Sequence, residues 1–497
     1  MAKFYDTLLG EYVKNPGRRW LKLDTLAEDY FDYQMISYDE ISQKKKLNFS
    51  EVELKNASVY SGEDVYMTHM LYEKQKSEGL LGEDVLMNME LPLIEAISSM
   101  ELTGVKIDRD TLKGIGMRLE NATRDLEKEI YDIAWVEFNI KSPKQVWEVL
   151  FEKLELPKGK KTKTWYSVSA DVLNNLSHEF PIAAKIVKYR HYSKLLGTYI
   201  EWLLNIATDN DLIHTSYNQA VTSTWRLSST NPNLQNIPSW WWVAGEIRSA
   251  FIPHNSGDKI VAFDYSQVEV RILAMMSGDE NLLHAFREGL DIHQTTAEFI
   301  FEKTDISGAE RKIAKAVNFG VIYGISPFGL SKNINISQKD AKVYIDWFYS
   351  NYPKVRSFFD DVITKCEETW YVQTLFGRKR YIKSINDKNK MIKSWAEREA
   401  INMPIQWTSA DIIKIAMLEI HNLLKNYKST MMMQVHDELV FNIVPEEFDE
   451  LTQKIPEIME SILVNFIDKI VYTDITKENF IPLKVDAGIG DNWKEAK

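Results

Sequence analysis

The sequence predicts an α+β fold, in which a β-core carries helices in separate lobes. Strand-like runs and turns gather at 211–263, and two apolar runs at 430–445 have the pattern of a hairpin. The chain is strongly helical in pattern from about residue 91 to 207, and again over 280–427. Strands and helices therefore occupy different stretches, and the fold class follows from that separation.

The helical elements before the first strands can be placed individually. Residues 1–90 mix helix-like and loop-like segments, and residues 109–135 predict one long, charged, amphipathic helix. A shorter helix is expected at 143–154, a Lys/Thr loop at 158–168, and further helices at 171–207.

Composition limits the class of protein. The 497 residues are enough for roughly two to four domains. The single cysteine, Cys366, rules out an internal disulfide framework and suits a reducing cytoplasm. With no apolar run of 18 residues and no signal-peptide pattern, we expect a cytoplasmic protein without a membrane span.

Charge alone argues mildly against a nucleic-acid partner, because the net charge is −12 and phosphate contact favours basic proteins. Three basic runs, at 44–46, 158–163 and 377–383, nevertheless stand out. They are consistent with ordinary solvated surface or with a basic cleft in an acidic chain.

The segment "KIVAFDYSQVEVRILAMMSGD", residues 259–279, predicts a buried strand followed by a helix. Asp264 stands at the end of the strand. A carboxylate in that place could hold a metal ion, or it could cap the helix, which aspartate does well.

The segment "MMMQVHDELVFNIV", residues 431–444, predicts a hairpin with His436, Asp437 and Glu438 at its turn. Ordinary polar turn chemistry is one interpretation. In the other, Asp437 and Asp264 meet on one sheet, where such a pair could hold two divalent ions about 3.5–4 Å apart, as in-line phosphoryl transfer requires.

The segment "ERKIAKAVNFGVIYG", residues 310–324, places Arg311, Lys315, Phe319 and Tyr323 at intervals of four. On a helix they share one face and extend over about 18 Å. Two cations followed by two rings would suit the triphosphate, sugar and base of a nucleotide. An amphipathic helix with a basic end and an aromatic core stripe would give the same pattern.

These three segments resemble motifs A, C and B of the family A DNA polymerases, the bacterial DNA polymerase I group. The resemblance runs in order from about residue 90 to the C-terminus, which makes chance an inadequate explanation. Further matching segments are "TSTWRLSSTNPNLQNIP" at 222–238, "DIHQTTAEFIF" at 291–301, "TLFGRKRYI" at 374–382, "EREAINMPIQWTSADIIKIAM" at 397–417, and "GDNW" at 490–493.

The resemblance implies a right-hand polymerase fold of palm, fingers and thumb, preceded by a truncated RNase H-like 3′–5′ exonuclease remnant. The implied boundaries are 1–88 for the remnant, 89–210 for the thumb and start of the palm, 211–279 for the palm with motif A, 280–395 for the fingers with motif B, and 396–497 for the palm with motif C. The loop at 158–163 would be the thumb tip that follows the duplex backbone.

The resemblance also implies the catalytic roles. Asp264 and Asp437 would bind two Mg²⁺ ions, for which Mn²⁺ would substitute, with Glu438 as an accessory acid. Lys315 would protonate the departing pyrophosphate as a general acid. Glu269 would be the steric gate that crowds a ribose 2′-hydroxyl and favours deoxynucleotides.

Substrate contacts follow in the same way. Three of the implied DNA contacts would lie in the minor groove near the primer end. The hydrogen-bond acceptors there are nearly the same for every correct base pair. The implied nucleotide-binding residues are Arg311, Lys315, Phe319, Tyr323, His293, Gln267, Glu269 and Arg248. The implied DNA-binding residues are Arg226, Gln406 and His436 at the minor groove, Arg398 on the template strand, and Asn402.

Residues 56–71, "NASVYSGEDVYMTHML", resemble the third motif of the family's exonuclease domain, with Tyr60 and Asp64 at its tyrosine and metal-binding aspartate. The first two exonuclease motifs of the family lie upstream of this point. We therefore expect no proofreading by this chain alone. Three explanations for the missing motifs are an expressed fragment, a gene split from its exonuclease half, and a mis-assigned start. A separate exonuclease chain is a candidate partner.

The chain has 14 tryptophans, and several stand where the family usually has glycine. These are Trp135, Trp165, Trp225, Trp370 and Trp407, and by the same comparison Trp147 and Trp202. One hypothesis is a codon read as glycine in the source but translated here as tryptophan. Genuine tryptophans that stack on single-stranded template, or that fill a looser core, are the alternatives. The run Trp240–Trp242 receives no site role.

The leading functional prediction is a monomeric, DNA-templated DNA polymerase that acts on primer-template DNA and dNTPs, in replication or repair, in a bacterial or phage-infected cell. A single-subunit RNA polymerase of related fold is an alternative against which Glu269 argues. A catalytically inactive DNA-binding scaffold is another, against which the four residues Asp264, Asp437, Arg311 and Lys315 argue.

Overall fold

The computed structural model describes residues 4–18, 20–157, 167–238, 245–467, 470, 475 and 479–497. The predicted thumb-tip loop at 158–163, Trp165 and Trp240–Trp242 lie outside these described residues. Among the described helices, none has both the length and the apolar character needed to cross a membrane.

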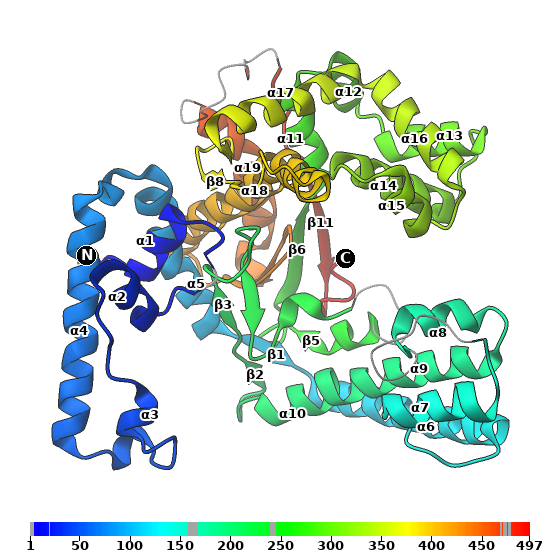
Figure 1. The fold of residues 1–497 in the computed structure, drawn as a ribbon, viewed down its shortest axis with the longest axis horizontal. Helices are drawn as coiled ribbons and strands as arrows, with labels where there is room; N and C mark the ends of the chain where they lie inside the picture. Colours follow the sequence, from blue (N-terminus) through cyan, green and yellow to red (C-terminus); the bar gives the residue numbers. More distant parts are fainter. Residues whose placement is uncertain are drawn as a thin grey trace.

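A four-stranded antiparallel sheet lies at the centre of the molecule (Figure 1). Its strands have the order β11–β6–β10–β9, and β9 and β10 form the hairpin predicted at 430–445. Asp264 pairs with Glu438 on one side and with Asp486 on the other. The strands are β6 (Lys259–Tyr265), β9 (Thr430–Val435), β10 (Glu438–Ile443) and β11 (Val485–Gly490).

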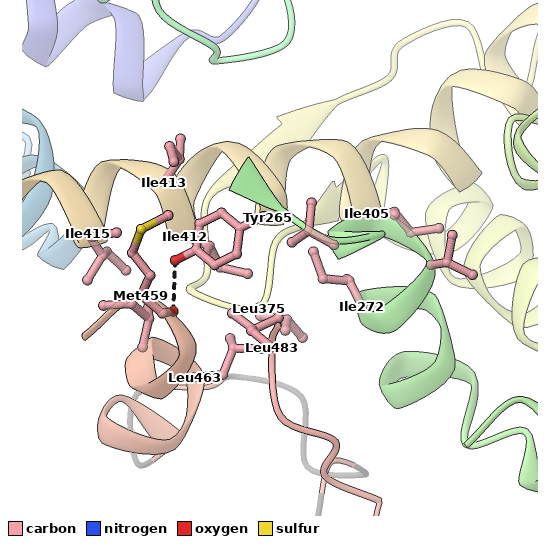
Figure 2. Packing of buried hydrophobic residues seen from close by; sticks show 14 of the residues in the cluster. Tyr265, Ile272, Leu375, Ile405, Ile412, Ile413, Ile415, Met459, Leu463 and Leu483 are labelled. Carbon is pink, nitrogen blue, oxygen red and sulfur yellow. Dashed lines mark hydrogen bonds between the residues drawn. The ribbon is translucent and has the colours of Figure 1, made fainter. Parts of the chain in front are cut away.

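Helices bury one face of this sheet and fix the strand that carries Asp264. Tyr265 is buried among isoleucine and leucine side chains, and its hydroxyl donates a hydrogen bond of 2.8 Å to the carbonyl of Met459 (Figure 2). Because the residue after Asp264 is anchored in this way, the carboxylate at the strand end has a defined position. The helices around this core are α5 (Leu91–Thr103), α11 (Val268–Ser277), α18 (Lys390–Leu424) and α19 (Phe448–Asn465).

A second helical group, between β6 and α18 in sequence, lies across the top and upper right of Figure 1. Ser307 and Glu310 form a capping box that starts α14. This is the helix predicted from the ladder of two cations and two rings, which consists of Arg311, Lys315, Phe319 and Tyr323. The helices of the group are α12 (Glu280–Arg287), α13 (Ile292–Phe301), α14 (Gly308–Ile322), α15 (Pro327–Asn333), α16 (Gln338–Asn351) and α17 (Pro353–Thr369).

A third helical group, at the lower right of Figure 1, has a hydrophobic core of its own. The helix predicted at 109–135 is present as α6, capped by Asp108, while the segment predicted at 143–154 is α-helical only to Trp147 and continues as a wider π-helical turn, Glu148–Lys153. The group consists of α6 (Arg109–Ala134), α7 (Pro143–Trp147), α8 (Ala170–Ser177), α9 (Pro181–Leu195) and α10 (Trp202–Ile206).

The remaining elements are short strands and an N-terminal helical layer on the left of Figure 1. The strands form the sheet β2–β1–β5 and the pairs β3–β4 and β7–β8. Their bounds are β1 (Val105–Ile107), β2 (Leu212–Ile213), β3 (Ser216–Asn218), β4 (Ser228–Thr230), β5 (Phe251–Ile252), β7 (Tyr371–Gln373) and β8 (Lys379–Tyr381). The helices are α1 (Thr7–Lys14), α2 (Leu23–Phe31), α3 (Tyr38–Ile41) and α4 (Leu54–Ser77).

Three of the unusual tryptophans have a backbone conformation that favours glycine. Their φ angles are +55° at Trp135, +62° at Trp225 and +65° at Trp370. A residue with a Cβ atom is disfavoured in this left-handed region, and a bulky one especially so. Trp407 differs, because it lies in the regular helix α18, where it is buried against Trp225.

Candidate active site

Two aspartates, predicted from separate segments, come together at one end of the central sheet. Asp264 ends β6, and Asp437 belongs to the two-residue turn between β9 and β10. The amide of Tyr265 donates to the carbonyl oxygen of Asp437 at 3.2 Å, which joins the turn directly to the end of β6. A cleft of about 420 Å³ is lined by both aspartates together with Glu438, His436 and Arg248.

Burial and neighbouring negative charges both raise the pKa of Asp264. Its side chain lines the cleft and reaches solvent, and partial burial, followed by the charges of Glu438 and Asp437, raises its pKa to about 6. Asp486 adds to this effect, and Lys497 opposes it. The carboxylates thus form a negative cluster that one lysine only partly neutralises, and a cation would stabilise such a cluster.

The raised pKa predicts that Asp264→Asn stabilises the metal-free protein at neutral pH. A folded-state pKa above the unfolded value means that the charged carboxylate costs folding free energy at pH 7.5, and that this cost disappears as pH falls from about 6 to 4. Because the side chain is exposed, we expect a gain of only about 1 kcal/mol. Thermal unfolding in EDTA at pH 7.5 and pH 4.5 measures it; an equal gain at both pH values would contradict the electrostatic cause.

Glu438 is held by the C-terminal segment that contains "GDNW". The indole Nε1 of Trp493 donates to Glu438 at 2.8 Å, and the Nζ of Lys497 lies 3.1 Å from its other carboxylate oxygen. The guanidinium of Arg248 stacks over the Trp493 ring at 3.9 Å and donates to the carbonyl of Ile237. Arg248 is buried, and its Nε and Nη1 have no protein partner, so it can still donate to a ligand in the cleft.

A chain of contacts joins Asp437 to the end of α14. The Nη2 of Arg226 lies 2.9 Å from a carboxylate oxygen of Glu269 and 3.6 Å from Asp437. The hydroxyl of Tyr323 donates to the other carboxylate oxygen of Glu269. Glu269 is buried, and burial raises its pKa despite these partners. The expected gate residue therefore stands between the aspartates and the aromatic end of the ladder.

Residues of α18 border the same chain. The side-chain amide of Asn402 donates to the carbonyl of Tyr323 at 3.2 Å, and Gln406 hydrogen-bonds the Tyr323 hydroxyl. Arg398 lies farther along, 6.0 Å from the centroid of the exposed Trp395 ring. Three of the expected DNA contacts are thus on one helix beside Tyr323.

The ladder on α14 has the spacing expected from its sequence. The Nζ of Lys315 lies 5.7 Å from the Phe319 ring centroid, and the rings of Phe319 and Tyr323 are 6.1 Å apart. The guanidinium of Arg311 bonds the carboxylate of Asp291, with Nε and Nη2 both 2.7 Å from Oδ2. Asp291 also caps α13, so it ties the basic end of the ladder to the neighbouring helix.

His293, in the first turn of α13, is buried beside Phe319, with the ring centroids 5.6 Å apart. Burial is the main cause that lowers its pKa to about 4, and the charges of Arg311 and Lys315 act in the same direction. The imidazole is therefore neutral at neutral pH, and its Nε2 has no protein partner.

Gln267 and the exonuclease-like pair complete the predicted set. Gln267 precedes α11 with φ +52°, and its buried Oε1 has no protein partner. Tyr60 and Asp64 lie on α4, in the N-terminal helical layer and away from the central sheet (Figure 1).

Sequence reasoning missed Asp486, Asp291 and Asn318. Only Asp291 had a local signal, as an acid directly before a helix.

The carboxylates suit a magnesium ion. Among the described residues, no three His, Cys, Asp or Glu side chains form a ready-made metal group. Mg²⁺ usually binds through one or two carboxylates and takes its other ligands from water and substrate phosphates. Hard oxygen donors in a cluster that raises the pKa of Asp264 match that preference.

The fold and this cleft define a class, the right-hand polymerases. A sequence model of DNA polymerase family A matches residues 109–495. The chain therefore belongs to the family A DNA polymerases.

Individual relatives agree with this assignment. DNA polymerase I of Bacillus subtilis (strain 168) is 41% identical over 500 residues, covering 99% of this chain and 55% of that protein. DNA polymerase I of Lactococcus lactis subsp. lactis (strain IL1403) is 44% identical over 432 residues, covering 86% of this chain and 48% of that protein. The chain thus spans about half the length of these curated relatives.

A solved structure extends the likeness to three dimensions. It is the POL domain of Pol1 from M. smegmatis in complex with DNA primer-template and dNTP. Its TM-score is 0.84 at 32% sequence identity, and the match covers 99% of this chain and 82% of that one. This likeness confirms the predicted right-hand fold.

Proposed function

We propose that this chain adds deoxynucleoside monophosphates to a primer 3′-hydroxyl, directed by a DNA template, with release of pyrophosphate. The observation that carries the proposal is the junction of Asp264 and Asp437 at one end of the central sheet, linked through Arg226 and Glu269 to Tyr323 at the end of the α14 ladder. The acids proposed to bind metal and the groups proposed to bind the nucleotide would then form one continuous site.

Asp264 and Asp437 would hold the divalent metal, which we propose to be two Mg²⁺ ions, with Glu438 nearby. When bound, the metal would activate the primer hydroxyl and stabilise the charge on the leaving pyrophosphate. Arg311, Lys315 and His293 would contact the triphosphate. Lys315 would also deliver a proton to the pyrophosphate oxygen.

Phe319 and Tyr323 would position the substrates, and Arg311 would change its contacts. Phe319 would stack on the nucleotide. Arg311 must first exchange its bond to Asp291 for a phosphate oxygen. The Tyr323 hydroxyl donates a hydrogen bond to one carboxylate oxygen of Glu269. Movement of Tyr323 away from Glu269 would open space beside the templating base.

Primer extension tests the proposal. A labelled primer-template with Mg²⁺ is expected to be extended with dNTPs and to be extended poorly with NTPs. Equal or better extension with NTPs would favour an RNA polymerase. Binding of the duplex without extension in either nucleotide set, with Mg²⁺ or Mn²⁺, would favour a DNA-binding scaffold.

The steric-gate role of Glu269 gives a separate prediction. Glu269→Ala is expected to raise the use of NTPs relative to dNTPs about tenfold, because overpacking against a 2′-hydroxyl costs about 1–3 kcal/mol. The ratio of kcat/KM for dCTP and CTP measures it. Glu269→Gln keeps the bulk and is the matched control; an unchanged ratio in Glu269→Ala would contradict the role.

Proofreading is expected to be absent from the chain alone. The exonuclease-like residues Tyr60 and Asp64 lie on α4, away from the central sheet (Figure 1), and Glu63 is the acid beside Asp64 in sequence. A primer with a mismatched 3′ end is incubated with Mg²⁺ and no nucleotides. Efficient, metal-dependent removal of the mismatched residue would overturn this expectation.

A further inference from the structure

A buried amide contacts the one imidazole that the proposed function places at the nucleotide phosphates. Asn318 lies on α14 and His293 on α13, and both side chains are almost completely inaccessible to solvent. The Asn318 Nδ2 lies 3.0 Å from the Nδ1 of His293. At that distance one of the two atoms must donate and the other accept, so the orientation of the amide decides where the imidazole carries its proton.

The Ile292 carbonyl favours one orientation of the amide. The Nδ2 of Asn318 faces that carbonyl oxygen at 3.4 Å, and its Oδ1 lies 3.0 Å from the hydroxyl of Thr296, which also lies 2.8 Å from the Ile292 carbonyl and can donate to only one of the two. Turning the amide over would place its oxygen against the Ile292 carbonyl, with two acceptors facing each other in a buried site. The Ile292 contact thus favours the orientation in which the amide nitrogen donates to Nδ1, and in that orientation Nδ1 is the unprotonated nitrogen of a neutral ring.

The other ring nitrogen is then the donor. Nε2 is buried and has no protein partner. The ring lies beside Phe319 and within the electrostatic reach of Arg311 and Lys315, the two proposed triphosphate contacts. A donor without a partner, next to two cations, is suited to an anionic oxygen that arrives with the substrate. Because Nε2 is buried in this conformation, the side chains that cover it must move before a phosphate oxygen reaches it.

We propose that Asn318 is a positioning residue that holds His293 in the Nε2–H tautomer, so that the uncharged ring donates a hydrogen bond to a phosphate oxygen of the incoming nucleotide. The inference rests on the proposed function, because it takes the contact between His293 and phosphate from there. With the proton on Nδ1 instead, the Nε2 lone pair would face the phosphate and repel it.

The tautomer itself can be measured without activity. Two-bond ¹H–¹⁵N spectra of ¹⁵N-histidine-labelled protein report which ring nitrogen is protonated, and His293→Phe identifies the signals of this ring. We expect the Nε2–H pattern in the parent and in Thr296→Val, which removes the hydroxyl on the far side of the amide. We expect Asn318→Leu, of similar shape, to lose it. An Nδ1–H pattern in the parent would overturn the proposal.

Kinetics test whether Asn318 acts through His293. KM for dNTP does not depend on the fraction of folded enzyme, so it remains informative if a variant folds poorly. Asn318→Leu is expected to raise KM about tenfold, the effect of losing one hydrogen bond to a charged group, with primer-template affinity unchanged. In a His293→Phe background the same substitution is expected to add less than twofold, because the two residues form one unit.

The possible results separate the two proposals. An equal rise in KM in both backgrounds would show that Asn318 acts only on the fold of α14, and would overturn the inference. If His293→Phe leaves KM unchanged, the phosphate contact fails and the proposed role of Asn318 fails with it, even when the spectra show the Nε2–H form. Primer extension by the parent, measured separately, decides the proposed polymerase function.

Discussion

Asp437→Ala is expected to slow single-nucleotide incorporation at least about a thousandfold. The carboxylate lies in the turn joined to the end of β6 and would hold the metal together with Asp264. Metal stabilisation of transition-state charge contributes several kcal/mol, and each 1.36 kcal/mol is a factor of about ten in rate. The fold should survive, because Asp437 is partly exposed and its nearest ion-pair contact is a 3.6 Å approach to Arg226.

Single-turnover incorporation of one dNTP measures this loss, with primer-template affinity determined alongside. Asp491→Ala makes the same chemical change just beyond the opposite end of β11, where Asp491 pairs with Lys259 on the surface. It should retain the parent rate within about twofold. A loss below about tenfold in Asp437→Ala, or an equal loss in Asp491→Ala, would contradict the assignment of Asp437 as a metal ligand.

The double variant Trp135→Gly/Trp370→Gly is expected to raise the free energy of unfolding by about 2 kcal/mol. Both residues end helices in the left-handed conformation, with φ of +55° and +65°; the side chain of Trp135 is largely exposed and that of Trp370 about half exposed. A left-handed residue with a Cβ atom costs roughly 1–2 kcal/mol, and glycine at this position after a helix avoids that cost.

Alanine at the same two positions is the matched control, since it removes the rings but keeps the Cβ atoms. Chemical denaturation of the parent and both double variants should therefore place the alanine protein near the parent and the glycine protein above it. If both variants change stability equally, the rings and not the backbone are responsible, and the hypothesis of glycine positions loses its main support.

The buried pair distinguishes glycine positions from genuine tryptophans. Trp225 has positive φ, and its ring centroid is 3.9 Å from that of Tyr12 at a 42° tilt, closer than the 4.5–7 Å usual for aromatic pairs. On the misread-codon hypothesis, which we retain as a proposal, Trp225→Gly/Trp407→Gly is at least as stable as the parent. A core adapted to tryptophan would instead lose about 3–5 kcal/mol for each ring. UGG codons at both positions would also reject the hypothesis.

Local sequence predicted the elements that carry chemistry, because their signals are local. The two apolar runs on either side of Asp437 predicted the hairpin, and the interval of four from Arg311 predicted the face of α14. The contribution of β11 was not predicted, because Asp486 lies in a short strand with no clear alternation and meets Asp264 only across the sheet. The π-helical turn after Trp147 was also missed, since a helical period does not distinguish the two.

The sequence by itself determined the family, the strand ends that carry Asp264 and Asp437, and the order of cations and rings before Tyr323, because motifs and periodicity are properties of neighbouring residues. Only the tertiary structure decided which groups alter one another. The pKa of Asp264 depends on its burial and on charges brought from β10 and β11. The tautomer proposed for His293 depends on an amide from another helix. Electrostatic and hydrogen-bond effects act over a few ångströms of space, and the chain brings these residues within that range only when it folds.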